Sequence, residues 1–261
     1  MVLPSLFVSH GAPTLPLTDT PARTFLTELG DRLARPTAIV VISAHWETES
    51  PVVSAVAHNP TIHDFYGFPR RLYELRYSAP GAPALAAEVA ELLRAAGLGS
   101  ALDKGRGLDH GAWAPLMLMY PRADIPVLQV SIQPHLGAAH HVRLGQALQK
   151  LRGEGVLVIG SGSFTHDLSE FRGQSLDEPV PNWVNGFADW FSDALVTRRT
   201  EDLLDYRQKA PFREKESSDR GALLAAVRKS LRGRQLARRT TARERNVRNL
   251  ADGCVRVFCT D

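Results

Sequence analysis

Histidines follow three apolar segments of the chain at the point where each segment ends. They close Phe7-Val-Ser-His10, Val41-Ile-Ser-Ala-His45 and Ile159-Gly-Ser-Gly-Ser-Phe-Thr-His166. Each segment is typical of a buried strand, and in an open α/β sheet ligands bind in the crevice beyond the carboxyl ends of the strands. Three imidazoles that reach one crevice could hold a metal ion, because neutral imidazole suits iron, zinc and copper alike. The pattern therefore favours a metal site formed by His10, His45 and His166.

A fourth histidine, His110, could join the same crevice. It lies in Asp109-His110-Gly111, directly before a short apolar segment. For any one of the four histidines, the alternative is a hydrogen-bonded, partly buried side chain without a ligand. Small neighbours that leave room around the rings favour the metal site instead: Gly11, Ala44, Gly111 and Gly162.

The remaining histidines give weaker signals. His63 belongs to the aromatic-rich stretch 60–69, in which Phe65 lies two residues further on. Such a loop could cover an apolar aromatic substrate, or it could simply pack against the body of the protein. His140 and His141 are neighbours on a predicted helix and therefore point to different faces, which favours a solvated surface for both.

The histidine-bearing strands belong to a chain in which strands and helices alternate. Continuous apolar runs predict buried strands over 6–10, 37–46, 126–132 and 155–161. Helical periodicity predicts helices over 82–96, 138–151 and 183–196, with a short buried helix over 112–120. This alternation predicts one α/β domain over residues 1–212, a sandwich around a mainly parallel sheet with helices on both faces.

Composition narrows the class of protein. The chain has 261 residues, of which 44% are apolar and 23% charged, as in ordinary globular proteins. No apolar run approaches the ~20 residues that span a bilayer, and the first residues lack the features of a secretion signal. We therefore expect a cytoplasmic enzyme with no membrane partner. Both cysteines, Cys254 and Cys259, lie in the last eight residues and define no disulfide framework.

The C-terminal segment differs from the rest of the chain. Residues 213–261 contain 13 Lys and Arg against 6 Asp and Glu, whereas residues 1–212 contain 18 against 22. All prolines and all histidines precede this tail, and Phe258 is its only aromatic residue. A basic tail could bind nucleic acid, but this one offers almost no aromatic rings to stack on bases and has no repeat. We therefore expect no nucleic-acid partner.

Seven short motifs resemble one known family in order and spacing. The sequence contains Ser9-His10-Gly11-Ala12-Pro13, Ser43-Ala44-His45-Trp46, Thr61-Ile62-His63-Asp64-Phe65 with Gly67-Phe68-Pro69, Tyr77-Ser78-Ala79-Pro80-Gly81, Leu108-Asp109-His110-Gly111-Ala112-Trp113, Met119-Tyr120-Pro121 with Asp124-Ile125-Pro126, and Gly160-Ser161-Gly162 with His166-Asp167-Leu168. Over residues 1–212 they resemble the DODA-type class III extradiol dioxygenases, the 4,5-DOPA dioxygenase group, which is related to protocatechuate 4,5-dioxygenase.

The resemblance implies a function and a set of roles. It implies a non-haem Fe(II) site, also found with Zn(II), that opens a catechol-type ring with O₂. It implies metal ligands at His10 and His45, an acid/base or additional ligand at His166, and a substrate-side acid/base at His110. His63, Phe65 and Trp113 are the predicted substrate-binding residues. A different class stays open: a metal-binding relative without oxygenase activity, either a zinc hydrolase or a scaffold.

The resemblance breaks off after Lys209-Ala210-Pro211-Phe212. The family there carries a third ligand histidine within a Pro-Thr-x-Glu-His-aromatic-x-Pro-Leu stretch, which this sequence lacks. One permitted codon choice for residues 213–227, read one base later, gives Ala-Arg-Lys-Asn-His-Pro-Thr-Glu-Glu-His-Phe-Trp-Pro-Leu. We therefore predict that residues 213–261 are an out-of-frame tail that leaves the site one ligand short and the activity impaired. If the tail is instead genuine, Glu47 beside His45 is the nearest candidate for a replacement ligand.

Overall fold

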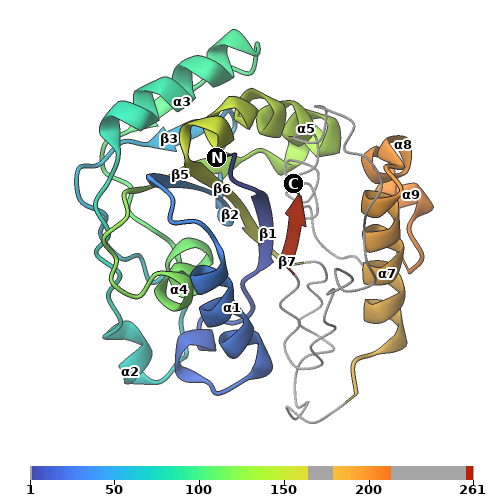
Figure 1. The fold of residues 1–261 in the computed structure, drawn as a ribbon, viewed down its shortest axis with the longest axis horizontal. Helices are drawn as coiled ribbons and strands as arrows, with labels where there is room; N and C mark the ends of the chain where they lie inside the picture. The colour runs from blue at the N-terminus through green and yellow to red at the C-terminus, as the bar shows by residue number, and fades with distance from the viewer. Residues whose placement is uncertain (1, 164–178, 213–256, 261) are drawn as a thin grey trace.

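A computed structural model of the chain describes residues 2–163 and 179–212 and the strand 257–260. Its centre is one sheet with the strand order β4-β3-β5-β2-β6-β1-β7 (Figure 1). The strands are β1 (Ser5–Ser9), β2 (Ala38–Glu47), β3 (Val52–Ser54), β4 (Ala101–Asp103), β5 (Val127–Ile132), β6 (Val156–Gly162) and β7 (Val257–Thr260).

The middle of the sheet is parallel. β2 pairs in parallel with β5 on one side and with β6 on the other, and β6 pairs in parallel with β1. The two ends of the sheet run the other way, because β3 is antiparallel to β5 and β7 is antiparallel to β1. The predicted mainly parallel α/β sheet is thus confirmed. β3 and β4 were not predicted, since three residues each are too few to show a period.

Helices cover both faces of the sheet, as predicted (Figure 1). One face carries α1 (Pro21–Arg32) and α4 (His110–Met119), and the other carries α3 (Pro83–Ala95), α5 (Gly137–Ala147) and α7 (Asn182–Val196). The shorter helical segments are η1 (Leu15–Leu17), α2 (Arg70–Tyr73), η2 (Pro134–Leu136), η3 (Gln149–Glu154), α8 (Thr200–Leu204) and α9 (Tyr206–Lys209).

β2 shows why its apolar run is continuous. Side chains alternate between the two faces of a strand, so Val40 and Ile42 enter the core beneath α3 and α5. Ile39 and Val41 enter the second core beneath α1 and α4. All four side chains are at most 1% exposed. A strand that is covered on both faces needs apolar residues at every position, which is the pattern that predicted it.

The helix predicted over 138–151 divides in two. α5 ends at Ala147, and the 3₁₀ segment η3 continues to Glu154. Gly155 then adopts a left-handed conformation with φ 80° and leads directly into β6. A left-handed residue is a common way to end a helical segment, and glycine adopts it without steric cost. The helical periodicity predicted the buried face but not this change of helix type.

The expectation that His140 and His141 are solvated was wrong. His140 is 6% exposed and His141 is fully buried, both beside Gln133 at the end of β5. Nε2 of His140 lies 2.9 Å from Oε1 of Gln133, and Nε2 of His141 accepts a hydrogen bond from the backbone N–H of Gln133. Nδ1 of His141 donates to the carbonyl oxygen of Gly137. These hydrogen bonds compensate for burying two polar rings, which helical periodicity alone does not reveal.

The burial of His141 predicts loss of stability in acid. Burial lowers the pKa of His141 from 6.5 to about 4. The unfolded chain therefore binds a proton on this residue at a higher pH than the folded protein. Its stabilising contribution is complete above pH 6.5 and decreases as the pH falls towards 4, by about 2 kcal/mol at pH 5. Urea unfolding of the wild type and His141→Gln at pH 7.5 and 5 tests this, because the variant should lose that part of the pH dependence. Equal pH dependence in the two proteins would contradict the prediction.

In the part of the chain that the structure describes, no helix combines the length and apolar character needed to cross a bilayer.

The four residues of β7 belong to the tail, and their backbone pairs with β1 from Ser5↔Thr260 to Val8↔Val257. A genuine tail would instead form a helix that packs on the body through one apolar face, Leu223, Leu224, Val227 and Leu231, and these positions lie outside the described residues.

Candidate metal centre

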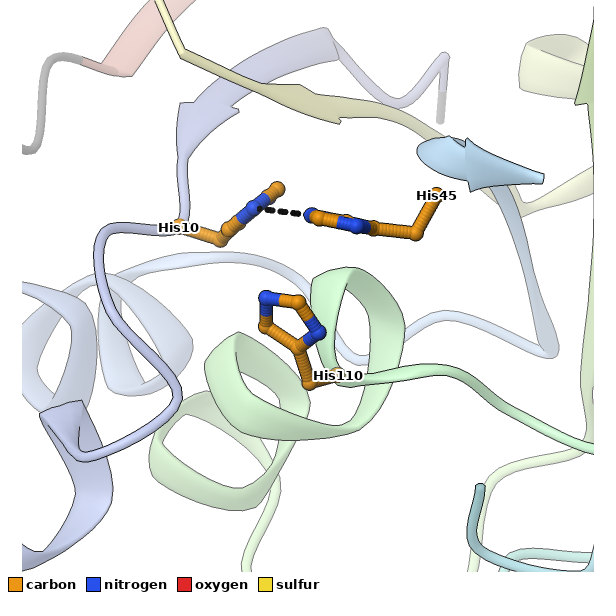
Figure 2. A group of neighbouring side chains, drawn as sticks. All are labelled: His10, His45 and His110. Atoms are coloured by element: carbon orange, nitrogen blue, oxygen red, sulfur yellow. Dashed lines mark hydrogen bonds between the residues drawn. The ribbon is translucent and has the colours of Figure 1, made fainter. Parts of the chain in front are cut away.

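Three histidines from three different elements meet at the carboxyl edge of the sheet (Figure 2). His10 follows β1, His45 lies near the end of β2, and His110 is the first residue of α4. One ring nitrogen of each lies within 4.8 Å of the others. The sequence predicted His10 and His45 as ligands and His110 as an acid/base, and the structure brings all three together. His166, the third predicted ligand and second predicted acid/base, lies outside the described residues.

Ser161 orients the ring of His10. The hydroxyl of Ser161 donates to the carbonyl oxygen of Gly111, so its oxygen can accept a hydrogen bond from Nδ1 of His10, 2.9 Å away. This arrangement requires the proton of a neutral His10 on Nδ1 and leaves the lone pair on Nε2. His10 is 5% exposed, and its partner Ser161 is fully buried. The ring is therefore held in one orientation with Nε2 towards His45.

An irregularity in the sheet places His45. The β2–β5 register shifts between Ile42 and Glu47, although β2 stays paired with β6 as far as Ser43. Such bulges re-aim side chains next to active sites. Nε2 of His45 consequently lies 3.0 Å from Nε2 of His10. Glu47, the candidate for a replacement ligand, is exposed and is not part of the histidine group.

Asp64 comes from the aromatic-rich loop and contacts two of the three histidines. Its Oδ2 lies 2.9 Å from Nδ1 of His110 and 3.4 Å from Nδ1 of His45, and its Oδ1 accepts the backbone N–H of His110 at 3.0 Å. Burial alone would raise the pKa of Asp64, but the hydrogen bonds and positive potential of His110, with a contribution from His45, lower it to about 2. Asp64 is therefore a carboxylate at neutral pH.

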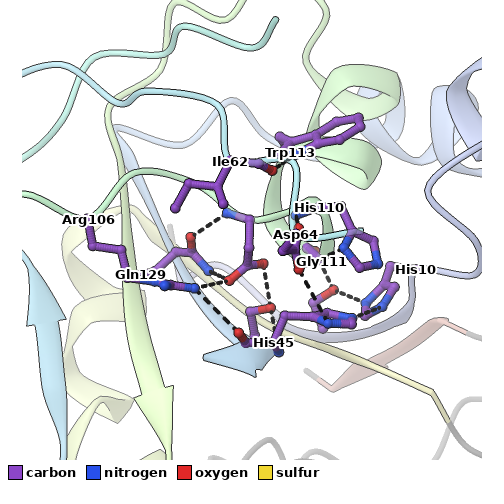
Figure 3. A network of polar contacts seen from close by, with 12 residues as sticks. His10, His45, Ile62, Asp64, Arg106, His110, Gly111, Trp113 and Gln129 are labelled. Carbon is purple, nitrogen blue, oxygen red and sulfur yellow. Dashed lines mark hydrogen bonds and ion pairs between the residues drawn. The ribbon is translucent and has the colours of Figure 1, made fainter. Parts of the chain in front are cut away.

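A second carboxylate, Asp109, forms hydrogen bonds next to the histidines, and two of its partners, Arg106 and Gln129, are labelled in Figure 3. It is completely buried and accepts hydrogen bonds from Ser43 Oγ at 2.7 Å, Gln129 Nε2 at 2.8 Å and Arg106 at 3.0 Å. Ser43 Oγ in turn accepts the backbone N–H of His45 at 3.2 Å. Asp109 thus connects the strand that carries His45 to the helix that begins with His110.

Close packing at Gly111 brings that helix against β2. A Cβ atom at this position would lie 2.5 Å from Ser43 Oγ and 3.1 Å from Cδ2 of His45. Cβ atoms essentially never approach other heavy atoms to less than 3.0 Å, so any larger residue would displace the hydroxyl of Ser43, the partner of Asp109, and crowd the ring of His45. The small residue beside His110 that the sequence suggested is therefore needed for this close approach.

The three predicted substrate-binding residues occupy different depths. The ring centroids of Phe65 and His110 are 5.7 Å apart, which places Phe65 beside the histidines. The ring of His63 meets that of Phe65 edge-on, with 5.7 Å between the ring centroids. Nε2 of His63 lies 3.1 Å from the carbonyl oxygen of Leu75. Trp113 is fully buried, and its Nε1 donates to the carbonyl oxygen of Ile62 at 2.9 Å. Trp113 therefore anchors the loop that carries Phe65.

Sequence reasoning missed the residues that hold the histidines: Ser43, Asp64, Asp109, Gln129 and Ser161. All except Gln129 occur inside the motifs quoted above, and Asp64 adjoins His63. A metal-binding histidine usually donates its second ring N–H to an oxygen of the protein, so oxygen-bearing side chains near predicted ligands were the available signal. Neither sequence separation nor periodicity could pair Asp64 with His110, 46 residues away.

The histidine group fits a transition metal. Nitrogens bound at about 2.1 Å to one ion are separated by about 3.0–3.4 Å for angles between a right angle and the tetrahedral angle. The 3.0 Å between Nε2 of His10 and Nε2 of His45 falls at the lower end of that range. The opposite nitrogens of His10 and His110 already contact Ser161 and Asp64, the outer-shell arrangement that metal-binding histidines use.

Comparisons with known proteins identify the family of this chain. The family described as the catalytic LigB subunit of aromatic ring-opening dioxygenase matches residues 4–237. The chain is 49% identical over 211 residues to 4,5-DOPA dioxygenase extradiol of Beta vulgaris, covering 79% of this chain and 78% of the relative. It is 44% identical over 195 residues to the protein of the same name from Escherichia coli K12, covering 74% and 71%.

A solved structure shares the fold. The crystal structure of an uncharacterized protein from Escherichia coli K12 superposes with a TM-score of 0.72 and 33% sequence identity, covering 90% of this chain and 91% of that one. The chain therefore belongs to the LigB family of extradiol aromatic ring-opening dioxygenases. The family match continues past residue 212, where the motif resemblance ends.

Proposed function

We propose that this protein is a non-haem Fe(II) dioxygenase that opens a catechol-type, DOPA-like ring with O₂, and that Zn(II) can occupy the same site. The observation that carries the proposal is the pair of Nε2 atoms of His10 and His45 at 3.0 Å, each on a ring whose other nitrogen faces a protein oxygen. The family and the named relatives supply the reaction class. We propose a cytoplasmic location, without a membrane or nucleic-acid partner.

His10 and His45 would hold the metal, together with His166. When bound, Fe(II) supplies a centre that catechol oxygens and O₂ can reach at once. His10 follows β1 and His45 lies on β2, the two strands that flank β6, and both residues are largely buried, with exposures of 5% for His10 and 17% for the His45 side chain. Restricted access of water strengthens the interaction between the imidazoles and a cation.

His110 would exchange a proton with the substrate. Its Nδ1 proton is directed to Asp64, so the lone pair of Nε2 is available to accept a proton from a catechol hydroxyl. The positioned carboxylate stabilises the resulting imidazolium, and His110 can return the proton later in the reaction. Phe65 would pack against the aromatic ring of the substrate, with His63 next to it. Trp113 would act through Ile62 by fixing the loop.

The test is anaerobic loading with Fe(II), followed by addition of a catechol and then air. We expect a new visible absorbance from the ring-opened semialdehyde, and none from protein that was not loaded with metal. Metal binding without that absorbance for any of several catechols would instead support the alternative of a hydrolase or a scaffold. Hydrolysis of an ester by zinc-loaded protein would separate those two.

We also propose that residues 213–261 are out of frame and contribute no residue to the catalytic site, which lies within residues 1–212. The loss of the family motif directly after Phe212 and the shift in charge at the same position support this proposal. The tail would then contribute no histidine ligand, and the activity would be impaired by a weakly held metal. The pairing of β7 with β1 shows that the last residues of the tail can still extend the sheet.

A further inference from the structure

We infer that Asp64 is a positioning residue that aligns His110 and His45 for metal and substrate, so that docking of its loop and binding of metal stabilise each other. The inference rests on the proposed function, since the ligand is the proposed metal ion. It is carried by one carboxylate that contacts both rings and the start of α4 at once (Figure 3).

The first step is the fixed orientation of the carboxylate. Oδ1 of Asp64 accepts the backbone N–H of His110, the first residue of α4. The first N–H groups of a helix have no partner within the helix, and the positive end of the helix dipole attracts an anion. The residue before the helix, Asp109, does not cap it, because its side chain is used by Ser43, Arg106 and Gln129. Asp64 therefore takes this position from a distant loop.

The second step is the direction of the other oxygen. With Oδ1 held by the helix, Oδ2 is directed at the Nδ1 atoms of His110 and His45. The hydrogen bond from Nδ1 of His110 to the carboxylate places the lone pair of that ring on Nε2, the atom that must face a metal or a substrate proton. The longer contact, 3.4 Å between Oδ2 and Nδ1 of His45, leaves Nε2 of the His45 ring directed towards His10. The two rings lie 4.0 Å apart between centroids, so one oxygen is sufficient for both.

The third step is the anchoring of the loop on both sides of Asp64. Before it, the backbone N–H of Ile62 donates to the carbonyl oxygen of Leu108, and Trp113 donates to the carbonyl oxygen of Ile62. After it, Phe65 packs between the rings of Phe68, Tyr73 and His110. The side chain of Asp64 is 19% exposed although the residue as a whole lies at the surface. The carboxylate is thus preorganised, at the boundary between loop and site.

The experiment compares Asp64→Asn and Asp64→Ala with the wild type. An amide has one accepting oxygen, so Asn can accept a hydrogen bond from the backbone N–H or from Nδ1–H of His110, as the two carboxylate oxygens do together, but not from both. Its N–H group would instead favour the tautomer of His110 whose Nδ1 accepts a hydrogen bond. We expect the Kd for Zn(II), measured by calorimetry, to rise by ~10–100-fold in Asp64→Asn, as for other outer-shell partners. Asp31→Asn, which removes the same charge from the outside of α1, should leave the Kd unchanged.

A metal-free measurement separates the positioning role from the proposed function. Without metal, we expect the two Asp64 variants to show faster hydrogen exchange than the wild type at the backbone N–H of His110. Their NMR spectra should also show that the His110 ring no longer favours the Nδ1–H tautomer. If the wild type binds no metal but these changes occur, the proposed function fails and the positioning role stands. If Asp64→Asn and Asp64→Ala keep the wild-type exchange, tautomer and Kd, the positioning role is wrong.

Discussion

Replacing His45 with Ala is expected to weaken metal binding by more than ~10²-fold, because losing a ligand costs more than losing one of its outer-shell partners. Ring-opening activity should be lost with the metal. His10→Ala should behave in the same way, since Nε2 of His10 faces Nε2 of His45 at 3.0 Å. Calorimetry with Zn(II) and turnover after anaerobic Fe(II) loading measure the two effects separately.

His110 is expected to give a different result. If it handles a proton, His110→Gln should retain metal while turnover of a catechol falls by ~10²-fold or more, the usual contribution of a positioned acid or base. His166→Ala should lower turnover by a similar factor. His58, an exposed histidine outside the group, provides the control, and His58→Gln should match the wild type.

Two outcomes would revise these roles. Loss of metal from His110→Gln would make His110 a ligand, which its place in the three-histidine group would permit. Unchanged turnover in His110→Gln and His166→Ala, with metal retained, would assign the proton transfer to other residues. Full metal binding by His45→Ala would mean that the histidine group is not the metal site.

Restoring the one-base-shifted reading from the codon of Arg213 is expected to recover a histidine ligand and activity together. Its product supplies Glu-Glu-His-Phe-Trp-Pro-Leu after Phe212 in place of the basic tail. Because an additional ligand completes the site, metal affinity should rise by ~10–100-fold or more relative to the present chain.

The measurement is to sequence the gene around the codon of Phe212 and to compare both proteins for Zn(II) affinity and turnover. A third protein, in which the restored histidine alone is changed to Ala, shows whether that side chain or the restored segment as a whole causes the gain. Equal affinity and turnover in the present and restored proteins would contradict the out-of-frame proposal. The tail would then be a genuine terminus of the family fold, in line with the match that extends to residue 237.

Much of the fold, and the approach of two of the three histidines of the site, could be predicted from the sequence. Apolar runs such as 37–46 predicted the buried strands, because a strand covered on both faces has no polar position. Parallel strands place their carboxyl ends along one edge, so histidines that follow two of them had to approach each other, as His10 and His45 do. The family motifs added His110, which meets them from α4.

The tertiary structure decided how these side chains are held. The bulge in β2 that aims His45, and the capping of α4 by Asp64 instead of Asp109, have no period or local motif. His140 and His141 were misassigned because a buried polar ring is stable only when its partners arrive with it, and Gln133 lies on a separate segment. Sequence patterns record which positions are buried, since burial repeats with the geometry of each helix or strand. The choice of hydrogen-bond partner depends on where a loop closes in three dimensions, as it does when Asp64 reaches His110 from 46 residues away.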